Sequence, residues 1–326
     1  MAQKTIEIRD LKTHFFTRRG LVKAVDGVNF SVGKGETLGL VGESGSGKSI
    51  TCLSILKLVP QPAGKIVGGE ILLNGVDLVP KTEKEMRQIR GGKISMILQE
   101  PMTSLNPVYT IADQVGEPIR LHQKLNRKGV FEKVKEMLTL VKIPSPEVRM
   151  KSYPHQMSGG MRQRIMGAMM LSCQPDLLIA DEPTTALDVT IQAQFLELIK
   201  GIQRDFNLSM IMVTHDFGIV AKACDLVAVM YAGQIVENAP IMEIFDNPQH
   251  PYTQALMNSL PKIEEKAHRL YSIAGQPPDL ADLPRGCNFL PRCPEAMEKC
   301  FQESPPRSEV REGHFVSCWL NDGQTS

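Results

Sequence analysis

The sequence predicts an α/β protein with a mostly parallel central sheet, and three observations carry this prediction. The run Gly42–Ser49 reads G-x-x-x-x-G-K-S and stands between a short apolar run and a helical run. Two further runs, Leu177–Ala180 and Met210–Val213, are wholly apolar, as is typical of strands buried in a parallel sheet. A long, mostly helical section separates the first feature from the others and indicates a helical subdomain inserted into the α/β core.

The composition is that of an ordinary globular protein with room for two domains. The 326 residues are 42% apolar and 22% charged, and the formal net charge of +1 gives no electrostatic case for nucleic acid as the main partner. The N-terminal residues lack the apolar core of a signal peptide, and no apolar run approaches the length of a membrane span. We therefore expect a cytoplasmic protein with reduced cysteines, which associates with membranes only through a partner.

The segment before the glycine-rich loop predicts an antiparallel β region. Apolar and polar residues alternate over Thr5–Asp10, which we expect to form an edge strand, and a strand pair is expected over Lys23–Val32. Phe15 or Phe16, which lies between them, can stack on an adenine ring, and packing on the sheet is the alternative interpretation.

The loop itself has the pattern of a phosphate-binding P-loop. Its glycines let backbone N–H groups surround phosphate oxygens, and the dipole of the following helix, expected over Ile50–Val59, favours an anion. Lys48 can reach the β- and γ-phosphates, and the Ser49 hydroxyl can bind Mg²⁺. A glycine-rich turn with a chance lysine is the alternative, but the strand, loop and helix context disfavours it. The expected nucleotide contacts here are Ser44, Gly45, Ser46, Gly47, Lys48, Ser49 and Ile50.

The middle of the chain changes from strands to helices. Gly68–Leu78 predicts a hairpin that turns at its Asn-Gly pair, and Ile94–Leu98 predicts a short buried strand that ends at Gln99. Apolar residues then recur at helical spacing over Val130–Val141. We expect the inserted helical subdomain to span about residues 100–175.

Three further groups of polar residues are candidates for the site. Ser158 is placed to cap a helix whose first turn, Gly159-Gly160, exposes N–H groups to an anion, although Ser-Gly-Gly is also common in loops. Asp181 and Glu182 end an apolar strand, where Asp181 can hold Mg²⁺ and Glu182 can orient or deprotonate water. The alternative is a strand that ends in solvated charge. His215 follows the next apolar strand and is expected to face the γ-phosphate.

These features occur in one order, and together they resemble the ATP-binding subunits of ABC transporters over roughly residues 1–240. The resemblance implies that Gln99 senses Mg²⁺ and the γ-phosphate, and that the segment after it contacts membrane subunits. Ser158-Gly159-Gly160 is similar to the core of the L-S-G-G-Q signature, from which the flanking methionines depart. Ala186-Leu187-Asp188 resembles the loop that bridges two subunits. The resemblance therefore implies a second ATPase subunit, a paralogue or another copy, whose ATP site is completed by this signature.

The remaining chain, residues 241–326, narrows the resemblance. His250-Pro251-Tyr252, Gly275-Gln276-Pro277-Pro278 and the run from Gly286 to Pro294 are similar to segments of dipeptide, oligopeptide and nickel importer ATPases. The family implies two integral membrane permease subunits, an extracytoplasmic substrate-binding protein that acts through the permease, and a peripheral position on the cytoplasmic face of the membrane. It also implies dipeptide or oligopeptide import, with nickel import as the alternative.

Four of the seven cysteines lie in this tail: Cys287, Cys293, Cys300 and Cys318. Their spacing is neither the close-paired pattern usual for zinc nor a ferredoxin run, so spacing leaves metal binding and free thiols equally open. The resemblance adds a preference, because some peptide-importer ATPases carry a [4Fe-4S] cluster in this tail. We therefore expect a structural [4Fe-4S] cluster, with zinc second and free thiols third.

Two other function classes fit parts of the sequence. A soluble ABC-type ATPase that acts on nucleic acid or ribosomes would usually carry two cassettes or a coiled-coil arm, and this chain has neither sustained heptads nor a basic stripe. A nucleotide-binding switch without turnover would not need Glu182 and His215. The sequence therefore favours an ATP-hydrolysing transporter subunit.

Overall fold

The computed structural model describes residues 3–97, 105–183, 189–260 and 272–322. These residues form two compact units, of which the first comprises Met1–Thr5, Val32–Glu36 and Pro80–Val213. The second unit comprises Ile6–Ser31, Thr37–Val79 and Thr214–Ser326. Gln99 and the run Ala186-Leu187-Asp188, both singled out in the sequence, lie outside the described residues.

The second unit contains a four-stranded sheet in the order β2-β1-β4-β5. Its strands are β1 (Lys4–Thr17), β2 (Gly20–Gly33), β4 (Gly64–Leu73) and β5 (Val76–Asp77). The prediction of an edge strand over residues 5–10 is wrong, because β1 has a neighbour on both sides and continues to Thr17 through a bulge near Asp10. The expected strand pair over residues 23–32 is the single strand β2. The predicted hairpin is confirmed, since Leu73 pairs with Val76 across Asn74 and Gly75, which both have positive φ.

A second set of strands in this unit has the order β11-β12-β10-β9-β3. The strand β3 (Thr37–Val41), wholly buried, runs parallel to β9 (Leu226–Tyr231), and β9 pairs antiparallel with β10 (Gln234–Pro240). The tail then returns to the same sheet, because β12 (His314–Val316) pairs with β10 and β11 (Ser308–Arg311) with β12. The C-terminal residues therefore extend the sheet that carries the P-loop strand.

Helices of the second unit lie around these strands. The P-loop helix α1 (Lys48–Ile55) ends before the predicted residue 59, because Lys57 adopts a left-handed conformation and the Leu58 N–H bonds back to the Leu53 carbonyl. A buried hydrogen bond of 2.8 Å between the hydroxyls of Thr13 and Ser54 ties α1 to β1. The remaining helical segments are α8 (Phe217–Ala223), α9 (Ile241–Asp246), α10 (Pro251–Asn258), η2 (Leu290–Arg292), α11 (Lys299–Gln302) and η3 (Trp319–Asn321).

The first unit contains three parallel strands in the order β8-β7-β6. They are β6 (Ile94–Ile97), β7 (Leu177–Asp181) and β8 (Ser209–Val213), and every residue of β7 and β8 is buried. This confirms the interpretation of the apolar runs as central strands. The helices α2 (Glu83–Ile89) and α7 (Val189–Phe206) belong to the same unit.

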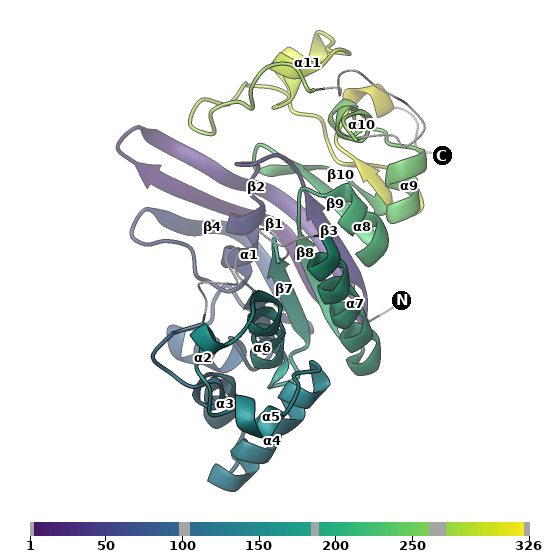
Figure 1. Ribbon diagram of the computed structural model, residues 1–326. Helices are drawn as coiled ribbons and strands as arrows, with labels where there is room; N and C mark the ends of the chain where they lie inside the picture. Colours follow the sequence, from purple (N-terminus) through teal and green to yellow (C-terminus); the bar gives the residue numbers. More distant parts are fainter. Residues whose placement is uncertain (1–2, 98–104, 184–188, 261–271, 323–326) are drawn as a thin grey trace. The chain divides into compact units, whose positions relative to one another are not determined.

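The helices of the predicted subdomain gather in one group within the first unit (Figure 1). Residues Val130, Val134, Met137 and Leu138 of α4 are buried, as their spacing predicts. Thr110 forms a capping box at the start of α3, and Ser158 caps α6. The group comprises α3 (Ile111–His122), α4 (Arg127–Leu140), α5 (Pro146–Arg149), η1 (Pro154–Gln156) and α6 (Gly159–Leu171). No helix in the described part of the chain has the length and hydropathy needed to cross a membrane.

Candidate functional site

The P-loop joins β3 to α1 and is closed by glycines that no other residue can replace without strain. Gly42 has φ of 151° and Gly47 has φ of 107°. A Cβ atom on Gly42 would overlap the Met230 carbonyl oxygen, and one on Gly47 would overlap the Ala24 carbonyl oxygen. The loop is thus pressed against the neighbouring backbone, which fixes the direction of its N–H groups.

Lys48 lies at the base of this loop with only 7% of its surface exposed. Its ammonium group donates hydrogen bonds to the carbonyl oxygens of Gly42 (2.8 Å) and Glu43 (2.9 Å), and lies 3.4 Å from the Ser46 hydroxyl. The Ser46 N–H also bonds to the Glu43 carbonyl at 3.2 Å. The loop therefore holds a buried cation at its centre, next to a helix N-terminus, which is the electrostatic requirement for a phosphate site.

Two contacts on Glu43 were not foreseen from the sequence. Its N–H donates to the Tyr252 hydroxyl at 2.9 Å, and its carboxylate accepts two hydrogen bonds from Arg292. Tyr252 stands in the His-Pro-Tyr segment that the sequence singled out, but nothing in the sequence indicates its partner. Both contacts lie within the second unit.

The acidic pair lies in the first unit, at the carboxyl end of β7. Asp181 is 4% exposed and is in register with Val213 of the adjacent strand β8. Glu182 has φ of 45°, and its N–H donates to the Val213 carbonyl oxygen at 2.9 Å. A left-handed conformation at a non-glycine residue is costly and is found preferentially at functional sites. The left-handed conformation of Glu182 turns the chain at the point where β7 ends.

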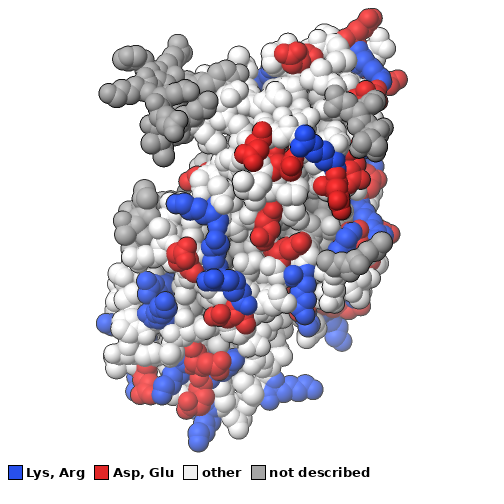
Figure 2. Space-filling view, turned by 90° about the vertical axis from the view of Figure 1, so that its right-hand side faces the viewer, with Lys and Arg blue, Asp and Glu red and all other residues white. Residues whose placement is uncertain are grey.

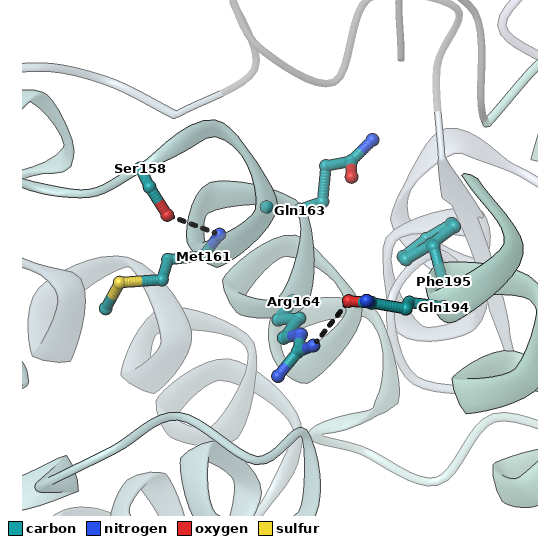
Figure 3. A pocket seen from close by; sticks show the side chains of 7 residues that line it. Ser158, Met161, Gln163, Arg164, Gln194 and Phe195 are labelled. Atoms are coloured by element: carbon teal, nitrogen blue, oxygen red, sulfur yellow. Dashed lines mark hydrogen bonds between the residues drawn. The ribbon is translucent and has the colours of Figure 1, made fainter. Parts of the chain in front are cut away.

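The Ser-Gly-Gly segment also lies in the first unit and lines a cavity of about 210 Å³ (Figure 3). The Ser158 hydroxyl accepts the Met161 N–H at 3.4 Å, as expected for a helix cap, and Arg164 donates to the Gln194 side chain at 3.4 Å. Gln163 is 2% exposed, and among the described residues neither amide atom of its side chain has a hydrogen-bond partner. The cavity is thus polar at the helix N-terminus.

Two other predicted residues lie in the second unit. His215 is exposed and directly precedes Asp216, the residue that caps α8. Phe15 is partly buried in β1, close to Gly64. Phe16 is 54% exposed, and its ring centre lies 5.7 Å from the Lys65 ammonium group. The roles expected for the three side chains remain predictions.

Comparisons with known proteins place this geometry in a family. The sequence matches the ABC transporter family over residues 25–185 and the C-terminal region of oligopeptide/dipeptide transporters over residues 236–300. It is 51% identical to the dipeptide transport ATP-binding protein DppD of Bacillus subtilis, over 98% of this chain and 96% of that protein. The oligopeptide transport ATP-binding protein AppD of Bacillus subtilis is also 51% identical, over 97% of this chain and 96% of that protein.

The chain belongs to the ATP-binding subunits of ABC transporters, in the oligopeptide/dipeptide group. It is therefore an ABC-type ATPase, as the sequence predicts. Solved structures confirm the fold. The ATP-binding cassette MJ0796, bound to ADP and phosphate in a dimer, is 23% identical with a TM-score of 0.64, over 72% of this chain and 98% of its own. The structure of cbiO1 from Clostridium perfringens is 24% identical with a TM-score of 0.63, over 75% of this chain and 92% of its own.

The tail of this ABC ATPase brings its four cysteines to one pocket. Cys287, Cys293, Cys300 and Cys318 line it together with apolar side chains that include Phe289 and Trp319. Burial raises the pKa of Cys287 and of Cys293, and it raises that of Cys318 to about 11. Within the described residues, no group of three or more His, Cys, Asp or Glu side chains is arranged to hold a single metal ion.

Proposed function

We propose that this chain is the ATP-hydrolysing subunit that powers import of dipeptides or oligopeptides across the cytoplasmic membrane. The observation that carries the proposal is the match of residues 236–300 to the C-terminal region of oligopeptide/dipeptide transporters. Relatives about half identical over nearly the whole chain bear peptide-transport names, among them AppD and DppD. We propose an ATP-binding domain over residues 1–240, with the helical subdomain at about 100–175, and a C-terminal domain over residues 241–326.

The roles within the site follow from the chemistry of each group. Lys48 and the P-loop N–H groups would bind the ATP phosphates, and a half-buried phenylalanine, Phe15, would cover the adenine. Mg²⁺, when bound, neutralises charge on the phosphates, and Ser49, Gln99 and Asp181 would hold it. Glu182 would orient and deprotonate the attacking water, while His215 would contact the γ-phosphate.

A second ATPase subunit, a paralogue or another copy, would face this one. Ser158, Gly159 and Gly160 of each subunit would then complete the ATP site of the other, since N–H groups at a helix N-terminus bind phosphate well. Two membrane permease subunits would anchor the pair at the cytoplasmic face of the membrane, and an extracytoplasmic binding protein would deliver solute to the permease.

Reconstitution tests this function. The chain is combined with a paralogous ATPase, the permease and the binding protein in vesicles, and uptake of labelled dipeptide, oligopeptide and nickel is measured with ATP inside or outside. We expect ATP-dependent peptide uptake that the Glu182→Gln variant abolishes. Uptake of nickel in place of peptide would support the alternative, and normal uptake with Glu182→Gln would contradict the catalytic assignment.

A non-transport ATPase that acts on nucleic acid is less well supported. On the face drawn in Figure 2, basic and acidic side chains are interspersed, and the net charge is +1. Binding to nucleic acid depends on a basic surface that neutralises phosphates. The charge balance and the transporter-type tail both favour the importer.

We further propose that the tail carries a [4Fe-4S] cluster. Support comes from four cysteines of one pocket, all of the ligand type that such clusters use. Each thiolate of a cluster binds a different iron, so its ligands need not converge on one point as they do for zinc. The cluster, when bound, would staple the proline-rich tail.

Elemental analysis tests the cluster. Protein purified without oxygen should contain about four irons and four sulfides per chain, and Cys300→Ser should lose them. Cys173→Ser, at a half-buried cysteine outside the tail, is the control and should keep them. One zinc per chain would replace the cluster with the alternative metal, and four thiols that react freely in the folded protein would contradict both.

A further inference from the structure

The side chain of P-loop residue Glu43 is bound by an arginine almost 250 residues later in the chain. Arg292 donates to both carboxylate oxygens of Glu43, at 2.6 Å from Nη1 and 3.0 Å from Nη2. Only 2% of the Arg292 side chain is exposed, against 30% for Glu43. A bidentate pair of this kind is charge-assisted at both bonds and fixes the relative orientation of the two groups.

Arg292 is itself held in place from two other sides. Its Nε donates to the Ala274 carbonyl oxygen at 3.0 Å, and its guanidinium lies 5.8 Å from the centre of the Tyr231 ring. An arginine guanidinium is not deprotonated in proteins, so Arg292 supplies a permanent positive charge at this position. The arginine is a fixed cation rather than a surface side chain that samples many conformations.

The backbone of Glu43 is bound as well. Its N–H donates to the hydroxyl of Tyr252 at 2.9 Å, and Tyr252 is fully buried. The Tyr252 ring packs at 4.6 Å from Tyr231 and 5.4 Å from Phe289, between ring centres. The side chain and the backbone of one P-loop residue are thus both tied to a buried aromatic cluster of the second unit.

Glu43 in turn organises the phosphate-binding loop. Its carbonyl oxygen accepts the hydrogen bonds of the Lys48 ammonium (2.9 Å) and of the Ser46 N–H (3.2 Å). A shift of Glu43 would therefore displace both the Lys48 ammonium group and the Ser46 N–H. An unpaired Glu43 carboxylate would also repel the phosphates, whereas the Arg292 guanidinium neutralises it.

We propose that Arg292 and Tyr252 are positioning residues, through which the C-terminal region sets the affinity of the P-loop for nucleotide. This inference rests on the proposed function only in that ATP binds at the P-loop. Both residues would act on the phosphate site through Glu43, which they contact directly. The C-terminal region of this transporter ATPase thereby acts on the nucleotide site, in addition to any role in assembly.

A double-mutant cycle on the full-length chain tests the proposal. Binding of a fluorescent ATP analogue is measured for the parent, Arg292→Gln, Glu43→Gln and the double variant. Arg292→Gln should bind about tenfold more weakly, since it leaves a partly buried carboxylate without its cation next to the phosphates. The double variant, which removes both charges, should recover to within about threefold of the parent. Arg311→Gln, at an exposed arginine 3.2 Å from Glu243, is the matched control and should bind like the parent.

Two further variants separate positioning from general damage to the fold. Tyr252→Phe keeps the ring but loses the hydroxyl, and should weaken ATP binding by about threefold with little change in thermal unfolding. Arg292→Lys keeps the charge but not the bidentate geometry, and should fall between the parent and Arg292→Gln. If Arg292→Gln fails to fold, the ATP affinities of these two variants test the positioning role.

The outcomes distinguish this inference from the function beneath it. Unchanged ATP affinity in Arg292→Gln and Tyr252→Phe, or losses that simply add in the double variant, would overturn the positioning role while the parent still binds ATP. A parent protein that binds no ATP would overturn the proposed function, and this inference with it.

Discussion

Glu237 of β10 anchors the His-Pro-Tyr segment and the tail to the sheet through several hydrogen bonds. The substitution Glu237→Gln should break or weaken these hydrogen bonds. The carboxylate is fully buried. Its Oε1 accepts the Gln249 N–H at 2.7 Å and lies 2.8 Å from His314 Nε2, and its Oε2 accepts the His250 N–H at 2.9 Å. Glutamine has the same shape but offers one oxygen and one NH₂ group.

The expected cost follows from this count. Whichever way the amide turns, its NH₂ faces at least one buried N–H donor, and a buried group left without a partner costs about 1–3 kcal/mol. The bonds that survive lose their charge assistance, which is worth about 1 kcal/mol each. We therefore expect Glu237→Gln to lower the free energy of unfolding by about 3 kcal/mol, within the range for breaking a buried charged network.

Urea unfolding followed by tryptophan fluorescence measures this effect, because the single tryptophan, Trp319, lies in the tail. With a slope of about 3 kcal/mol per molar urea, the midpoint should fall by about 1 M. Glu312→Gln makes the same chemical change on an exposed side chain two residues from His314, and should stay within about 0.5 kcal/mol of the parent. Equal midpoints for the two variants would refute the assignment of Glu237 as the anchor.

Other predictions concern the nucleotide site. Gly47→Ala should abolish ATP binding in an equilibrium assay, because its Cβ would overlap the Ala24 carbonyl; normal affinity would show that the loop can shift. Lys48→Ala should weaken ATP binding at least tenfold, and an unchanged dissociation constant would contradict the buried phosphate-binding cation. Glu182→Gln should retain ATP in a stable dimer, which nucleotide retention and oligomer size would measure. Near-normal turnover in this variant would show that Glu182 is not the base. His215→Ala should lower turnover more than binding; unchanged turnover would make it structural.

The local elements of the candidate site could be predicted from the sequence because each is a local pattern. The P-loop, the buried strands β7 and β8 and the cap of α6 at Ser158 all lie within ten consecutive residues of the signal that indicates them. Glycine, an apolar run and a cap residue act through backbone conformation, burial and local hydrogen bonds, so their neighbours in sequence suffice.

The contacts that join the C-terminal residues to the rest of the second unit had no such signal. In the sequence, nothing distinguishes Arg292 from the other basic residues of the proline-rich tail. The alternation of apolar and polar residues in β1 did not indicate that strands lie on both of its sides. An ion pair across almost 250 residues leaves no periodicity, since its residues are set by tertiary packing alone.

The C-terminal residues therefore contribute direct contacts to the P-loop. Glu237 holds the residues before Tyr252, and Tyr252 and Arg292 together hold Glu43. The chain of contacts runs from the sheet through the His-Pro-Tyr segment to the carbonyl that binds the P-loop lysine. Each step is a short hydrogen bond between buried or partly buried groups. A change in the tail can therefore shift the residues of the phosphate site through these bonds. On the proposal above, substitutions at Tyr252 or Arg292 would change the ATP affinity of this chain without altering its P-loop sequence.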